Sequence, residues 1–162
     1  AVLDGGFQAW QAAGGALTTE LPLLRPTTFT AKVRDAMVDA DYVRAFLQTS
    51  RMHLVDARSP DRFRGENETL DPVGGHIPGA VNRFFRDNLQ ADGCFKSPAE
   101  LRAEWLAFLA GSSPEQVVHL CGSGVSACLA MLAMEIAGLP GSRLYAGSWS
   151  EWCADRGRPV TK

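Results

Sequence analysis

The sequence has no apolar run long enough to cross a membrane and no cluster of basic residues. Its most apolar segment, residues 127–139, is interrupted by Glu135 and is far shorter than the roughly 18 residues that a membrane-spanning helix needs. Sixteen lysines and arginines stand against eighteen aspartates and glutamates, giving a formal charge of −2. These absences exclude a membrane span and argue against a nucleic-acid or membrane-surface partner, so an anionic ligand must be held by a local site.

The four cysteines form no C-x-x-C pair and have no zinc-like spacing, and the chain begins without a signal-peptide pattern. Cys121 and Cys128 are separated by seven positions of loop and helix, which is too far along the helix axis for an easy disulfide. We therefore expect reduced thiols, a cytoplasmic location and no bound metal.

What is present is the composition of one ordinary globular domain with some extra length: 162 residues, of which 46% are hydrophobic and 21% charged. From residue 28 onward, short apolar segments alternate with helical patterns, which is typical of an α/β protein. Strands are expected at 29–33, 53–57 and 116–120, and helices at 39–48, 61–64, 97–109 and 124–137. The sequence thus predicts a mostly parallel sheet with 116–120 as its central strand and helices on both faces.

The first fifteen residues repeat a pattern found near the C-terminus. Gly5-Gly-Phe-Gln-Ala-Trp10 and Gly147-Ser-Trp-Ser-Glu-Trp152 share a glycine, an aromatic residue two positions on and a tryptophan three positions beyond that. Their offset of 142 residues is about one domain length. We expect residues 1–15 to be the remnant of a preceding, related domain, 16–27 a linker and 28–162 the domain that carries the chemistry; chance similarity is the alternative.

The segment 117–131 places Cys121 between an apolar strand and an apolar helix. A buried cysteine is commonly a small packing residue. At a strand-to-helix turn, however, loop N–H groups and the helix N-terminus favour an anion, and Gly122 and Gly124 allow the tight curl. Because the thiolate is the nucleophilic form of cysteine, such a turn favours a reactive Cys121. The segment 56–64 follows a second strand and is expected to meet this loop at the same edge of the sheet.

Three activities use a cysteine at such a strand-to-helix turn. A C-x5-R phosphatase needs an arginine at the position held here by Ala127, which disfavours phosphatase chemistry. Redox sensing or disulfide exchange requires a nearby resolving cysteine, and Cys128 is poorly placed for that role. Sulfur transfer is the third activity.

Four separated segments resemble the rhodanese-type sulfurtransferase family. They are Asp56-Ala-Arg-Ser-Pro-Asp-Arg-Phe-Arg-Gly65, Gly75-His-Ile-Pro-Gly-Ala-Val-Asn82, His119-Leu-Cys-Gly-Ser-Gly-Val-Ser-Ala127 and Tyr145-Ala-Gly-Ser-Trp-Ser-Glu-Trp152. The form of the cysteine loop is similar to that of 3-mercaptopyruvate sulfurtransferases. The resemblance implies a catalytic rhodanese-like domain at 28–162, preceded in a tandem arrangement by an inactive rhodanese-like domain of which 1–15 is the end.

The resemblance also implies a mechanism without a cofactor. Cys121 takes a sulfur atom from a small anionic donor as a persulfide and passes it to cyanide or to a thiol such as that of thioredoxin. Arg62 matches the arginine that binds the donor's anionic end, and a guanidinium suits a bidentate contact with a carboxylate. Asp56 and Arg58 are expected to support the site. The other expected donor-binding residues belong to the cysteine loop: Gly122, Ser123, Gly124, Val125 and Ser126.

Neither His76 nor His119 is expected to be the catalytic base. His76 lies in a glycine-bounded turn that it is expected to order, and the side chain of His119 is expected to point away from the anion.

The loop indicates which donor is used. Family members that prefer thiosulfate, a compact dianion, tend to carry cationic side chains at the two positions after the cysteine, which here are Gly122 and Ser123. A neutral loop with one hydroxyl suits the monocarboxylate 3-mercaptopyruvate, because Ser123 can donate to the oxygen that gains charge as sulfur leaves. The second arginine expected in mercaptopyruvate enzymes is absent from residues 66–71. Its candidate replacements are Arg64, Arg83 and Arg86.

Two further expectations concern a partner chain and the alternative to an enzyme. If residues 1–15 end a preceding domain, that domain is expected on a separate fragment associated with this chain. A non-catalytic rhodanese-like binding module is the alternative to an enzyme, although such a module would not need the nucleophile.

Overall fold

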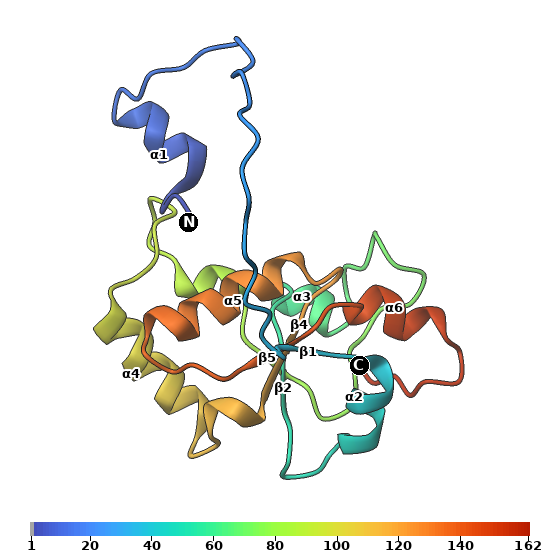
Figure 1. Ribbon diagram of the computed structural model, residues 1–162. Helices are drawn as coiled ribbons and strands as arrows, with labels where there is room; N and C mark the ends of the chain where they lie inside the picture. The colour runs from blue at the N-terminus through green and yellow to red at the C-terminus, as the bar shows by residue number, and fades with distance from the viewer. Residues whose placement is uncertain (1) are drawn as a thin grey trace.

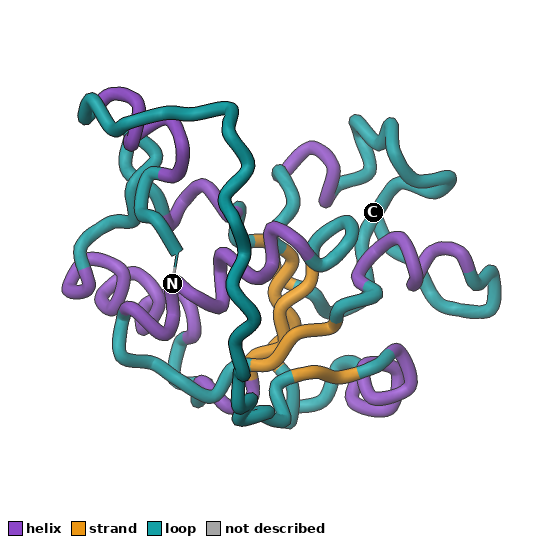
Figure 2. Tube along the Cα trace, turned by 45° about the horizontal axis from the view of Figure 1, so that its top comes forward, coloured by secondary structure: helices purple, strands orange, loops and turns teal. Residues whose placement is uncertain are grey.

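A five-stranded sheet with all strands parallel forms the centre of the molecule, in the order β1-β5-β4-β2-β3 (Figure 2). The structure is a computed structural model that describes residues 2–162. The strands are β1 (Met37–Val38), β2 (His53–Asp56), β3 (Val81–Asn82), β4 (Val117–Leu120) and β5 (Arg143–Tyr145). All four residues of β4 are buried at the centre of the sheet. The parallel sheet and the central position of β4 confirm the sequence prediction.

The helices begin and end at the signals that the sequence carries. Ser97 forms the expected capping box with Glu100, and Pro60 opens a single helical turn after Ser59. Gly138 has a φ of 68°, the left-handed conformation that ends many helices. The helices are α1 (Gly6–Ala12), α2 (Ala40–Phe46), α3 (Pro60–Phe63), α4 (Pro98–Leu109), α5 (Val125–Ile136) and α6 (Ser148–Ala154), with 3₁₀ turns η1 (Phe85–Asn88) and η2 (Pro114–Gln116).

Helices cover both faces of the sheet, as predicted (Figure 1). Neighbouring strand residues point to opposite faces, so Leu54 packs with α2 and α6 while Val55 packs with α4 and α5. Trp149 and Trp152 fill the first core, and Trp105 fills the second; all three are fully buried. Because both faces are covered, the ligand site must lie at the ends of the strands rather than on the sheet.

The predicted strand at 29–33 is wrong. Residues 13–36 form neither helix nor strand, and Phe29 and Val33 are 87% and 93% exposed. The edge strand is instead β1, whose residues pair with Leu144 and Tyr145 of β5. Apolar residues alternate with polar ones in the earlier segment, whereas Met37 and Val38 are adjacent, but only the later segment lies beside β5 and can pair with it. The predicted helix at 39–48 also ends early, at Phe46.

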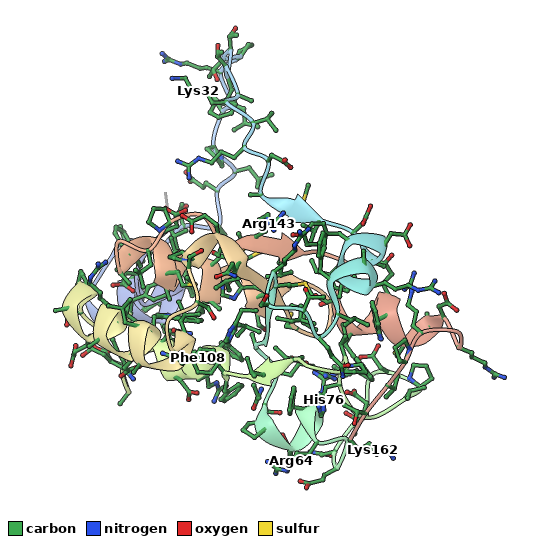
Figure 3. The ribbon with its side chains drawn as sticks, turned by 90° about the horizontal axis from the view of Figure 1, so that it is seen from below. Lys32, Arg64, His76, Phe108, Arg143 and Lys162 are labelled. Carbon is green, nitrogen blue, oxygen red and sulfur yellow. The ribbon has the colours of Figure 1, made fainter. Side chains whose placement is uncertain are left out.

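The N-terminal segment lies apart from both cores. Figure 1 shows residues 13–36 as a long extended stretch between α1 and β1, and Lys32 projects from that stretch in Figure 3. No residue of α1 is buried, and Phe7 is 62% exposed. Two polar contacts join this segment to the domain: Asp4 accepts a hydrogen bond from the Phe95 N–H at 2.9 Å, and Arg34 lies 3.6 Å from Glu135 of α5.

The two similar segments at the ends of the chain have similar local structures. Both α1 and α6 are seven residues long, and the second residue of each pattern has a positive φ: 62° at Gly6 and 54° at Ser148. The assignment of residues 1–15 to a preceding domain stays a prediction. Among residues 2–162, no helix combines the length and the apolar character that a bilayer span requires.

Candidate active site

The parallel sheet brings the two predicted site segments together. Asp56 and Leu120 are register partners at the carboxyl ends of β2 and β4, and the Ala57 N–H donates to the Leu120 carbonyl at 2.8 Å. Cys121 is the next residue after Leu120. The chain then turns sharply into α5 through Gly124, whose φ is 81°. A Cβ on Gly124 would lie 2.6 Å from the Ala146 carbonyl oxygen, so only glycine fits this turn.

Residues at the start of α6 form hydrogen bonds with the cysteine loop. The Cys121 N–H donates to Ser148 Oγ at 3.1 Å, and Ser148 Oγ donates to the Tyr145 carbonyl at 2.9 Å. The N–H groups of Trp149 and Ser150 donate to the carbonyls of Cys121 and Gly122. Ser148 is fully buried with a φ of 54°, which is uncommon for a residue with a side chain. Sequence reasoning missed this residue, although it lies inside a segment that resembled the family.

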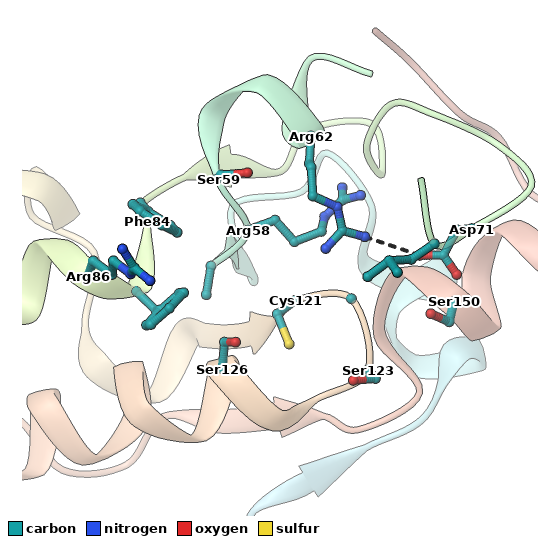
Figure 4. A pocket seen from close by; sticks show the side chains of 14 residues that line it. Arg58, Ser59, Arg62, Asp71, Phe84, Arg86, Cys121, Ser123, Ser126 and Ser150 are labelled. Carbon is teal, nitrogen blue, oxygen red and sulfur yellow. Dashed lines mark hydrogen bonds and ion pairs between the residues drawn. The ribbon is translucent and has the colours of Figure 1, made fainter. Parts of the chain in front are cut away.

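Cys121 lies at a pocket of about 550 Å³ at this edge of the sheet (Figure 4). Its own exposure is only 3%, so the thiol is reached through the pocket. Six of the predicted residues line the pocket: Arg58, Arg62, Cys121, Gly122, Ser123 and Ser126. Arg86, a candidate for the missing second arginine, also lines the pocket. The lining residues that sequence reasoning had not assigned to the site are Ala57, Ser59, Leu70, Asp71, Phe84, Phe85 and Ser150.

Three predicted residues lie outside the pocket lining. Gly124 and Val125 belong to the turn and the start of α5, and Val125 is 75% exposed. Any contact of these two residues with a donor would have to use their backbone N–H groups. Asp56 is fully buried behind the pocket, where it accepts hydrogen bonds from Arg58.

Arg58 ties together the segments that surround the cysteine. Its Nη2 lies 2.7 Å from Asp56 and donates to the Gly75 carbonyl at 2.8 Å, while Nη1 lies 3.4 Å from Glu68. Its guanidinium also lies 4.7 Å from the ring centre of Trp149 on α6. The pairing with a carboxylate that the sequence analysis expected is therefore present, and Arg58 links β2, the 65–75 loop and α6.

Arg62 lies directly above the cysteine loop. A Cβ built on Gly122 would lie 3.6 Å from both terminal nitrogens of Arg62. The same guanidinium pairs with Glu68 at 2.8 Å and with Asp71 at 3.4 Å. Burial raises the pKa of Glu68, but hydrogen bonds from Arg62 and from backbone N–H groups outweigh it, so this pKa lies below its usual value. Arg62 thus faces the site with much of its charge already compensated.

Of the three candidate replacements for the second arginine, one lines the pocket. Arg64 forms an exposed pair with Glu66 at 2.8 Å, and Arg83 pairs with Glu104 at 2.9 Å while its guanidinium lies over Trp105. Arg86 lines the pocket.

Neither His76 nor His119 lines the pocket, as expected. His76 Nδ1 lies 2.9 Å from the Phe63 carbonyl oxygen, and its ring stacks on Phe63. His119 is fully buried with its ring edge-on to Trp105, and burial lowers its pKa to about 3.

Known proteins are similar to this chain in sequence and in fold. The rhodanese-like domain family profile matches residues 39–155. The chain is 48% identical over 160 residues to a probable 3-mercaptopyruvate sulfurtransferase of Pseudomonas aeruginosa, covering 98% of this chain and 56% of that protein. It is 39% identical to the mouse thiosulfate sulfurtransferase, covering 93% of this chain and 52% of the mouse protein. The chain therefore spans about half the length of the curated relatives it matches.

A solved structure has a similar fold. The anaerobic ergothioneine biosynthesis enzyme from Chlorobium limicola matches 99% of this chain and 41% of its own length, with a TM-score of 0.84 and 26% identity. The curated relatives hold the matched region and their remaining length in one chain, so they give no support for a separate fragment. By family profile and by identity over nearly its whole length, this chain belongs to the rhodanese family.

Proposed function

We propose that this chain is the catalytic domain of a sulfurtransferase that carries sulfur as a persulfide on Cys121. The observation that carries the proposal is the position of Cys121. It follows a buried strand, lies at a pocket that is also lined by Arg58 and Arg62, and precedes a helix whose positive end is directed toward it. Cysteine reacts as the thiolate, and the free N–H groups at the start of a helix can stabilise an anionic sulfur.

The proposed reaction has two steps. The Cys121 thiolate attacks the donor's terminal sulfur. With 3-mercaptopyruvate the carbon–sulfur bond breaks, its electron pair remains with the pyruvate enolate, and a proton taken up by that enolate gives pyruvate. With thiosulfate the sulfur–sulfur bond breaks and sulfite leaves with the pair. Cyanide or a thiol, including that of thioredoxin, then attacks the outer sulfur of the persulfide and returns Cys121 as the thiolate.

We propose 3-mercaptopyruvate as the preferred donor. Gly122 and Ser123 add no positive charge, and two carboxylates already compensate Arg62, so the loop side of the pocket is poorly suited to a dianion. Ser123 lines the pocket and can donate a hydrogen bond to the carbonyl oxygen that becomes negative in the enolate. The relative that is 48% identical is named a probable 3-mercaptopyruvate sulfurtransferase, which supports the same donor.

Arg62 is proposed to hold the donor's anionic end with the nitrogens that lie over Gly122. Asp56 and Arg58 are proposed to fix the surrounding loops, since their hydrogen bonds join β2, Gly75 and Glu68. Residues 1–15 are proposed to end a preceding rhodanese-like domain.

A cyanide assay tests the function. The chain should form thiocyanate from cyanide and 3-mercaptopyruvate, and Cys121→Ser should reduce the rate to that of the uncatalysed reaction. Cys128→Ser is the matched control, because Cys128 is an exposed cysteine on α5 that does not line the pocket. Turnover that survives in Cys121→Ser, or no turnover of the unmodified chain with either donor, would contradict the proposal and favour a non-catalytic module.

A further inference from the structure

The charges around the pocket are unevenly compensated. On the side formed by α3 and the 65–75 loop, the two guanidinium groups of Arg58 and Arg62 contact three carboxylates: Asp56, Glu68 and Asp71. This side therefore has no surplus of positive charge to attract an anion. A donor that carries one or two negative charges needs a cation from elsewhere in the pocket.

Arg86 supplies an uncompensated charge from η1, across the pocket. Figure 4 shows Cys121 between Arg86 on one side and Arg62 on the other. Within residues 2–162, the Arg86 guanidinium forms no ion pair and no hydrogen bond. Its one aromatic contact is with Phe85, whose ring centre lies 5.8 Å from the guanidinium carbon. All five of its N–H donors are therefore available to a ligand, and a guanidinium matches a carboxylate or an oxyanion in a bidentate contact.

We infer that Arg86 binds the anionic group of the sulfur donor while its sulfur is delivered to Cys121, an inference that rests on the sulfurtransferase function proposed above. Arg62 and Arg86 then contribute differently to binding the donor's anionic group. Arg62 contacts the anionic group from the loop side, but Glu68 and Asp71 largely neutralise its charge, whereas Arg86 provides the net attraction. The acceptor enters after the donor's anion has left, so it does not need this contact.

Two-step kinetics separate the donor from the acceptor. In a reaction that passes through a covalent intermediate, kcat/KM for the donor reports only the step that loads Cys121, and kcat/KM for the acceptor only the step that unloads it. Arg86→Gln should lower kcat/KM for 3-mercaptopyruvate about tenfold to a hundredfold, the range expected for a lost hydrogen bond to a charged group. The loss should be larger for thiosulfate, which carries two charges, and kcat/KM for cyanide should change by less than about twofold.

The matched control is Arg156→Gln, which removes the same charge from an exposed arginine outside the pocket lining. It should behave like the unmodified chain. As a readout apart from turnover, thiosulfate binding to Cys121→Ser should weaken when Arg86→Gln is added, measured by titration calorimetry.

An unchanged donor kcat/KM in Arg86→Gln, or a loss confined to the acceptor, would overturn the inference while leaving the proposed function intact. No turnover in the unmodified chain would instead overturn the proposed function, and with it this inference.

Discussion

Replacing Ser148 with alanine should loosen the cysteine loop, because one hydroxyl joins Cys121 to β5. The hydroxyl accepts from the Cys121 N–H at 3.1 Å and donates to the Tyr145 carbonyl at 2.9 Å. Ser148 is fully buried, so water cannot easily replace it. A buried group left without its partner costs about 1–3 kcal/mol. With two such groups and partial relaxation, we expect Ser148→Ala to lower the free energy of unfolding by about 2–4 kcal/mol.

A glycine at the same position separates the contribution of the hydrogen bonds to stability from the cost of the backbone strain. Ser148→Gly loses the same two bonds but removes the cost of a positive φ, which is roughly 1 kcal/mol for a residue with a Cβ. Glycine should therefore be less destabilising than alanine by about 1 kcal/mol, the reverse of their usual order inside a helix. Ser150→Ala is the control. Its hydroxyl makes no hydrogen bond within residues 2–162, and it should change the stability by less than about 0.5 kcal/mol.

Urea unfolding followed by tryptophan fluorescence measures all three variants, since Trp149 and Trp152 are buried beside the loop. The reasoning is refuted if Ser148→Ala matches Ser150→Ala in stability, or if glycine proves worse than alanine. Ser148→Ala should also slow the loading of Cys121 in a single-turnover reaction with 3-mercaptopyruvate. Ser148→Thr is expected to retain the hydroxyl, but it adds backbone strain because threonine is branched at Cβ.

Three other perturbations test the site and the core. Arg62→Ala should raise KM for both donors about tenfold or more, because it also leaves Asp71 without its ion pair and Glu68 paired with Arg58 alone; steady-state kinetics showing a lower kcat at unchanged KM would count against this role. Ser123→Lys should shift the ratio of kcat/KM values toward thiosulfate, and a wild-type preference for thiosulfate would show that the neutral-loop argument fails. His119 stays uncharged in the folded protein but is protonated below pH 6.5 when unfolded, so it should cost about 1.4 kcal/mol of stability per pH unit as the pH falls from 6.5 toward 3. Urea titrations of His119→Phe should lack this component, and an equally steep pH dependence in that variant would be inconsistent with a neutral buried His119.

The sequence predicted those elements whose signals are local. The capping box at Ser97 and the proline at Pro60 act through neighbouring residues, and both helices begin where expected. The segment 29–33 has the residue pattern of a strand, but a strand also needs a partner edge, which local sequence does not reveal. The position of Cys121 was predictable because the carboxyl ends of parallel strands meet at one edge.

The partners of the charged residues could not be predicted. Arg62 was expected to face a donor, and its pairing with Glu68 and Asp71 depends on how the 65–75 loop folds back over α3. The role of Ser148 depends on contact between α6 and a loop 27 positions earlier in the chain. Arg86 was one of three equivalent candidates until the structure placed Arg64 and Arg83 in other ion pairs. In each case the missing information was a long-range contact.

Persulfide formation on Cys121 can be read directly from the mass of the protein after reaction with the donor alone. The chain is incubated with 3-mercaptopyruvate in the absence of an acceptor, and its intact mass and peptide masses are measured before and after addition of cyanide. We expect a gain of one sulfur atom located on Cys121, which cyanide removes and which Cys121→Ser does not acquire. A chain that gains no sulfur from either donor, or that gains it on Cys94, Cys128 or Cys153, would contradict sulfur transfer through Cys121.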